Sequence, residues 1–190
     1  NQNEFKKIIK NNIIHKGKKL NISSVHFNFL KYPKDIDADN NDLLLRQGIQ
    51  YHWKNNNFNS FDDFLNSLSS RKRKLIKKER LYIKNRNINI DILTGKNINK
   101  NHWNFFFECY TNTVNRKWGA PYLTQDFFQK IGKNLSDKII LIVASVNGKM
   151  IACALNFTSK SHLYGRIWGA IEQIPNLHFE LCFYQAIEYA

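Results

Sequence analysis

The stretch KIILIVASVNGKMIACALNFTSKSHLYGRIW, residues 138–168, carries the strongest fold signal of this chain. It divides into three expected strands, Lys138–Val146, Met150–Phe157 and His162–Trp168. The first two are joined at Asn147-Gly148, a dipeptide typical of a two-residue hairpin turn. They are apolar at nearly every position, as strands covered on both faces are. The stretch therefore predicts an antiparallel meander in the middle of a domain.

The neighbouring segments place this meander in a larger pattern. Ile88–Leu93 alternates as a strand, and Lys100–Asn115 and Thr124–Leu135 read as helices between it and the meander. An amphipathic helix is expected after residue 176. The order strand, two helices, three strands, helix predicts a mixed α/β (α+β) fold, with a largely antiparallel sheet flanked by helices.

Upstream of this core the pattern is less regular. The periodicity predicts a helix at Glu4–Ile14, a strand at Ser23–Leu30, a short helix at Asn41–Gln47, a strand at Ile49–Trp53, and a helix at Phe61–Leu68 with Ser60 as its N-cap.

Basic charge clusters between Leu68 and Arg86, where nine Lys or Arg residues stand against one acid, Glu79. We expect a helix docked through one apolar stripe, with its charges facing outward. The stripe comprises Leu68, Leu75, Ile76, Tyr82 and Ile83. The charged surface is interpreted either as a solvated helix face or as a contact for a polyanion. The polyanion candidates are Arg71, Arg73, Lys74 and Arg80.

Composition narrows the remaining possibilities. The formal net charge of the chain is +14, which suits RNA, a nucleotide or an acidic membrane surface as a partner. The three cysteines lie far apart in apolar patterns and are expected to be reduced core thiols of a cytoplasmic protein. The histidine spacings suggest no metal site, and no apolar run has the roughly 20 residues of a membrane span. The chain starts at Asn1 and stops inside a helical pattern, so we expect a fragment of a longer protein.

Arg166 is the unusual residue of the third strand. Alternation predicts that it shares one face with Tyr164 and Trp168. A guanidinium among aromatic side chains needs a partner, because an unpaired buried charge is costly. From the residues alone two kinds of partner stay open, an internal carboxylate or a ligand. The carboxylates considered are Glu172, Glu180 and Glu188.

Two family resemblances follow from these segments. The order of elements from Ile88 resembles the GNAT acyltransferases, in which an Arg or Gln, two residues, Gly, one residue, then Gly or Ala precedes the third helix and holds coenzyme A. Arg166 and Gly169 match that pattern, but Ile171 does not. A wider set of motifs is similar to the FemAB-like family: YHWKN (51–55), FDDFLNSLSSRKRKLIKKER (61–80), KWGAPYLTQDFF (117–128), IACALNF (151–157), LYGRIWG (163–169) and LHFELCFYQAIEYA (177–190).

The second resemblance implies two tandem GNAT-like halves. Residues 1–67 would end the first half, 68–86 would be a basic linking helix, and 87–190 would begin a second half that is truncated at its C-terminus. It also implies an N-acyltransferase that moves an acyl or aminoacyl group onto a small-molecule or peptide amine, such as that of a peptidoglycan-type precursor. The donor would be acyl-coenzyme A or aminoacyl-tRNA, with tRNA as a partner in the latter case, and the fragment would be incomplete for activity. The alternative is a non-catalytic module that recognises a cell-wall precursor or RNA.

Acyl transfer to an amine needs a base and groups that position both substrates. His178 and Glu180, at the start of the last helix, are the candidate bases; equally, they could be a helix-start residue and an acid that complements the helix dipole. Lys117, Trp118 and Tyr122 form a cluster whose aromatic members could also be core. The substrate-binding candidates together are Tyr164, Arg166, Trp168, Lys117, Trp118, Tyr122 and Tyr184.

Overall fold

The structure is a computed structural model that describes residues 2–28, 43–46, 48–117 and 119–190. The chain divides into two compact units, Asn1–His52 and Trp53–Ala190. The first unit contains α1 (Gln2–Lys19), which is longer than the predicted helix. The mixed α/β fold predicted from the sequence is confirmed, and the second unit carries its sheet.

The sheet has four antiparallel strands in the order β1-β2-β3-β4, which is also their order along the chain. Asn147 and Gly148, which join β2 to β3, both have positive φ, as a type I′ hairpin turn requires. The predicted meander is therefore present. The strands are β1 (Asn89–Thr94), β2 (Ile139–Val146), β3 (Lys149–Thr158) and β4 (Leu163–Ala170).

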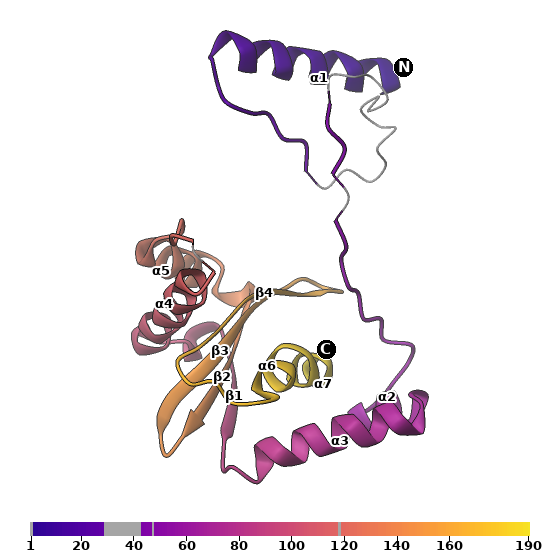
Figure 1. Ribbon diagram of the computed structural model, residues 1–190, viewed down its shortest axis with the longest axis vertical. Helices are drawn as coiled ribbons and strands as arrows, with labels where there is room; N and C mark the ends of the chain where they lie inside the picture. The colour runs from indigo at the N-terminus through magenta and orange to yellow at the C-terminus, as the bar shows by residue number, and fades with distance from the viewer. Residues whose placement is uncertain (1, 29–42, 47, 118) are drawn as a thin grey trace. The chain divides into compact units, whose positions relative to one another are not determined.

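Helices cover both faces of this sheet (Figure 1). On one face α4 (Lys100–Asn115) and α5 (Gln125–Asn134) pack through aromatic residues such as Phe106 and Phe128. Thr124 caps α5 as predicted, by accepting a hydrogen bond from the amide of Phe127. Two short 3-10 turns lie at the ends of strands: η2 (Gly95–Asn97) follows β1, and η3 (Ser136–Lys138) precedes β2.

The opposite face is covered by α3 (Ser70–Lys84) and by the last helix of the chain. That helix runs as α6 (Leu177–Phe179), a π-helical turn η4 (Glu180–Tyr184) and α7 (Gln185–Tyr189). Leu177 and Leu181 bury its apolar side against β2 and β3. The sequence predicted the helix but not the π turn inside it.

The helix α2 (Phe61–Ser67) precedes α3 and starts where the sequence predicted. The Ser60 side chain accepts a hydrogen bond from the Asp63 amide, which makes Ser60 the N-cap. Leu68 ends α2, so the basic helix begins at Ser70.

The predicted apolar stripe of the basic helix is only partly right. Ile83 is buried, but Leu75 is 54% exposed, whereas Arg73, Glu79 and Arg80 are half-buried. The inward face of α3 is therefore partly charged. Glu79 and Arg80 turn inward because they find partners on the last helix of the chain.

Three predictions in the first 53 residues are wrong within the described residues. Residues 23–28, 43–46, and 49–53 form neither a strand nor a helix, while the rest of the predicted strand at Ser23–Leu30 and helix at Asn41–Gln47 lies outside the described residues. Alternation alone does not make a strand, because the backbone groups of a strand need a paired neighbour.

Candidate functional site

A β-bulge shapes the exposed end of β4. The register between β3 and β4 shifts at Leu155/Asn156, so that Gly165 opposes Asn156 while Ile167 opposes Leu155. The extra residue is Arg166. Beyond the bulge, Ile167 packs toward α4 and α5, and Trp168 packs toward α3 and the last helix.

The predicted shared face of Tyr164, Arg166 and Trp168 is therefore wrong. Strict alternation would put Leu163 and Trp168 on opposite faces, but both pack on the same core cluster. A bulge adds one residue to a strand and thereby reverses the alternation beyond it. Trp168 and Tyr164 consequently do not flank the guanidinium together.

The guanidinium of Arg166 is exposed and donates a hydrogen bond of 3.0 Å to the Tyr122 hydroxyl. Two of the carboxylates considered as its internal partner, Glu180 and Glu188, bind Arg80 instead. Arg166 and Tyr122 thus come together from separate predicted clusters. Lys117 is exposed, and Trp118 lies outside the described residues. Tyr164 is half exposed and stacks on the ring of His162.

His178 lies at the start of the last helix, beside the far end of β4. Its ring meets the edge of Trp168 at 5.2 Å between centroids and also contacts the rings of Phe179 and Phe183. The ring is nevertheless exposed. Partial burial among these aromatic rings lowers the pKa of His178 from its ordinary value. A lowered pKa favours the neutral imidazole, which is the form that can accept a proton.

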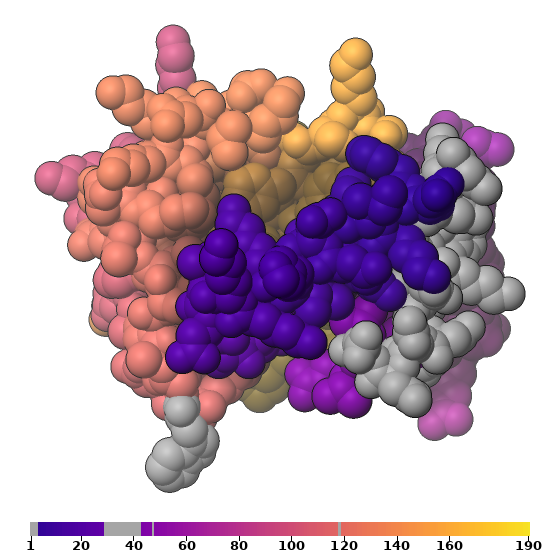
Figure 2. Space-filling view, turned by 90° about the horizontal axis from the view of Figure 1, so that it is seen from above, coloured from indigo at the N-terminus to yellow at the C-terminus, as the bar shows by residue number. Residues whose placement is uncertain are grey.

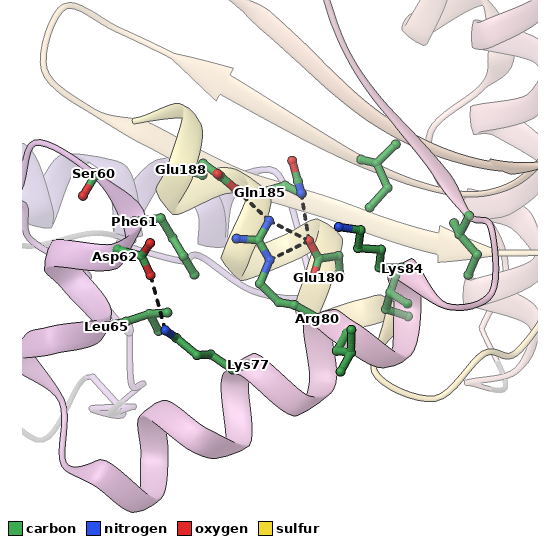
Figure 3. A pocket seen from close by; sticks show the side chains of 14 residues that line it. Ser60, Phe61, Asp62, Leu65, Lys77, Arg80, Lys84, Glu180, Gln185 and Glu188 are labelled. Carbon is green, nitrogen blue, oxygen red and sulfur yellow. Dashed lines mark hydrogen bonds and ion pairs between the residues drawn. The ribbon is translucent and has the colours of Figure 1, made fainter.

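Glu180 occupies a different environment, the inner wall of a pocket of about 580 Å³ between α2, α3, β1 and the last helix. The side chain of Glu180 is almost fully buried, with Arg80 and Gln185 bonded to its Oε1 (Figure 3). Its Oε2 is buried with no hydrogen-bond partner among the described residues. A buried carboxylate needs such partners, and Arg80 is the principal one.

Arg80 links this carboxylate to a second one. Its Nη2 lies 3.1 Å from Glu180 Oε1 and 2.7 Å from Glu188 Oε2, and its guanidinium also lies over the ring of Phe61 at 4.6 Å. Burial by itself would lower the pKa of Arg80, but the two carboxylates outweigh burial and raise it. The side chain predicted to contact a polyanion is therefore engaged inside the protein.

The π-helical turn brings another polar side chain to α3. The hydroxyl of Tyr184, a predicted substrate-binding residue, donates a hydrogen bond to the carboxylate of Glu79. Burial, and then the neighbouring Glu79, raise the pKa of Tyr184 above its ordinary value. Tyr184 thus joins the last helix to α3, close to Arg80 and Glu180.

The remaining basic candidates differ in orientation. Arg73 donates hydrogen bonds to the Asn66 carbonyl and to the Ser70 hydroxyl, so its guanidinium folds back onto the start of α3 and the end of α2. Arg71 and Lys74 are exposed on the outer side of α3. Only these two of the four predicted polyanion residues point away from the protein.

The structure separates the two predicted bases. His178 contacts Trp168, whereas Glu180, two residues later on the same helix, faces α3. Positions two apart on a helix do not face each other. Sequence reasoning did not assign roles to Glu79, Gln185 or Phe61. The one available signal was that Glu79 is the single acid in a strongly basic helix.

One backbone amide of the segment that resembles the GNAT pattern already has a hydrogen-bond partner. The amide of Ile171, the residue that departs from the GNAT pattern, donates a hydrogen bond of 2.8 Å to the Ile151 carbonyl. Gly169 is required by packing, because a Cβ atom there would lie 2.4 Å from the Cys109 carbonyl oxygen. The match at Gly169 thus has a structural reason that involves no phosphate.

The three cysteines are free thiols, as predicted, with Cys109 and Cys153 buried. Burial raises the pKa of Cys182 to about 12 and raises that of Cys153, which also lies against Cys109. The described part of the chain contains no group of three or more His, Cys, Asp or Glu side chains placed to hold a metal ion. It also contains no helix that is both long and apolar enough to cross a membrane.

Comparison with known proteins adds one finding to this geometry. The profile of a family described as FemAB-like, peptidoglycan biosynthesis/recognition, matches residues 1–190, the whole chain. A comparison with curated proteins finds no match.

Proposed function

The chain belongs to the FemAB-like family of peptidoglycan biosynthesis and recognition, and from this premise we propose that the protein is an N-acyltransferase. In the proposed reaction an acceptor amine attacks the carbonyl carbon of an activated acyl or aminoacyl ester or thioester. The new C–N bond forms, the C–O or C–S bond to the donor breaks, and the proton lost by the amine passes through the base to the departing alkoxide or thiolate. Direct attack in a ternary complex needs one base and two positioned substrates.

The observation that carries this proposal is the environment of His178. An amine nucleophile must transfer its proton to a group that is unprotonated at neutral pH. The pKa of His178 is lowered by burial among aromatic rings while its ring is exposed, and these two properties suit a general base. Trp168 and Phe183 would hold the imidazole ring in place.

Glu180 is less suited to take the proton. Its Oε1 is engaged by Arg80 and Gln185, and its Oε2 is buried. We assign it a positioning role instead, because the Arg80–Glu180 ion pair fastens α3 to the helix that carries His178. Glu188 and the Tyr184–Glu79 hydrogen bond add to the same attachment.

Arg166 and Tyr122 are proposed to contact the donor. A guanidinium recognises phosphate through two parallel N–H groups, and both acyl-coenzyme A and aminoacyl-tRNA carry phosphates. Arg166 is exposed, and among the described residues its hydrogen-bond partner is a neutral hydroxyl, which leaves its charge available to a ligand.

The test is acyl transfer by the full-length protein with acyl-coenzyme A or aminoacyl-tRNA as donor and a peptidoglycan-type precursor as amine acceptor. His178→Ala should lower kcat by about 100-fold or more while donor binding is retained. The matched control is His52→Ala, which removes an exposed histidine of the other unit. Unchanged turnover in His178→Ala would overturn the assignment of the base. Precursor binding without turnover by the wild-type protein would instead favour the recognition module.

A further inference from the structure

The outer side of α3 presents one continuous stripe of exposed residues that the proposed function does not use. Arg71, Lys74, Leu75, Lys78 and Leu81 follow one another at helical spacing, and all five are exposed. Leu81, at one edge of the stripe, also borders the pocket beside Glu180. Leu75 and Leu81 are each 54% exposed. We propose that this stripe binds the surface of a membrane that contains anionic lipids.

Charge complementarity points to an anionic partner. Three of the five residues are basic, and Glu79, the only acid between Ser70 and Lys84, turns inward to the Tyr184 hydroxyl. Asp62, on α2, pairs with Lys77 rather than with the stripe. Basic side chains on a helix are attracted to the negative surface potential of anionic lipids.

The exposed leucines favour a lipid surface over a nucleic acid. Phosphates of RNA offer nothing apolar to Leu75 and Leu81, and the stripe itself carries no aromatic side chain on which bases could stack. The nearest aromatic residue on α3, Tyr82, has the guanidinium of Arg86 over its ring at 4.6 Å. In a bilayer interface, by contrast, leucine side chains enter the acyl region while lysines remain among the headgroups.

The five residues span about 120° of the helix circumference, with Leu75 and Leu81 at the two edges and the basic residues between them. Arg71 and Leu81 are ten positions apart, which is about 15 Å along a helix. The inward side of the same helix is held by Ile83 in the core and by the Arg80 ion pairs. The stripe is thus presented by a helix that is already fixed, so binding requires no refolding of α3.

The test is co-sedimentation of the full-length protein with vesicles of phosphatidylcholine alone or with about 30% phosphatidylglycerol. Binding is expected only to the anionic vesicles. Lys74→Gln/Lys78→Gln should weaken vesicle binding about 25-fold, because each basic residue near an anionic surface contributes roughly fivefold in affinity. Leu75→Ser/Leu81→Ser should weaken it about tenfold, because each leucine has half its surface available for burial.

The matched control is Lys130→Gln/Lys133→Gln, which removes the same charge from exposed positions of α5. It should bind as the wild type does. Equal weakening by this control would overturn the proposal, since binding would then follow net charge. Absence of vesicle binding would overturn it too, as would RNA binding that Lys74→Gln/Lys78→Gln weakens and Leu75→Ser/Leu81→Ser leaves unchanged. Circular dichroism and thermal unfolding of each variant check that the fold is kept.

Discussion

The ion pair between Arg80 and Glu180 should be a major contributor to the stability of the second unit, and a double-mutant cycle would measure it. The perturbations are Arg80→Met, Glu180→Gln and the two together. Arg80→Met removes the ion pairs of the guanidinium with Glu180 and Glu188. Of the hydrogen bonds described for the buried Glu180 carboxylate, the one from Gln185 then remains. Methionine keeps much of the apolar stem of arginine, so the variant tests charge more than packing.

The magnitude follows from burial. Removing one partner of a fully buried ion pair costs about 3–5 kcal/mol. The side chain of Arg80 is 26% exposed, so the loss of stability from Arg80→Met should be about 3 kcal/mol. Glu180→Gln keeps an acceptor for Arg80, whose charge still faces Glu188, so we expect a loss of about 1 kcal/mol. With both charges absent no buried carboxylate is left unpaired, and the double variant should lose about 2 kcal/mol. The expected coupling is therefore about 2 kcal/mol.

The assay is urea unfolding, followed by tryptophan fluorescence and circular dichroism. The dependence of the free energy of unfolding on urea concentration is compared between variants, to check that each one unfolds in a single transition. Asp126→Asn and Lys130→Met on α5 form the control cycle. Both side chains of that ion pair are exposed, so the cycle should show no measurable coupling. Additive effects of Arg80→Met and Glu180→Gln, or a larger loss from Glu180→Gln than from Arg80→Met, would refute the reasoning.

Two further predictions concern Tyr184 and Gly169. Because burial and Glu79 raise the pKa of Tyr184 in the folded state, its contribution to stability is complete below its ordinary pKa of 10.0 and is lost as the pH rises beyond it. The free energy of unfolding should therefore fall above about pH 10 in the wild type and fall less in Tyr184→Phe, and equal slopes in the two proteins would contradict this. Gly169→Ala should lower the free energy of unfolding by about 2–3 kcal/mol because its Cβ would collide with the Cys109 backbone. Gly165→Ala on the same strand meets only Asn156 at 3.6 Å and serves as the control, and equal losses in both would show that a general strand effect is responsible.

Much of the second unit was predictable because its signals are local. Asn147-Gly148 specifies a hairpin through the positive φ of both residues, and Ser60 and Thr124 mark the starts of helices through side chains that accept backbone hydrogen bonds. Alternating or helical apolar periodicity then identified β1 to β4 and the helices on both faces. The same reasoning failed at Ile49–Trp53, where apolar residues are not paired into a sheet.

The candidate site was less predictable, because its geometry depends on contacts between distant segments. The bulge at Arg166 reverses strand alternation, and its one local signal, Gly165 inside the strand, does not say which residue is the extra one. Arg80 and Glu180 are 100 positions apart, so the residues alone could not show that one would be the partner of the other. Sequence patterns assign charged residues of an amphipathic helix to solvent by default, and α3 departs from that rule at Glu79 and Arg80.

Local patterns were enough to predict the mixed α/β fold, the meander, the basic helix and the FemAB-like motifs, since each rests on spacing or chemistry within a short segment. Only the tertiary structure decided which charges of α3 face inward, where Arg166 points, and that His178 and Glu180 have separate surroundings. The physical reason is that a buried charge is tolerated only where a partner lies within bonding distance, and the partners here come from segments that only folding brings together.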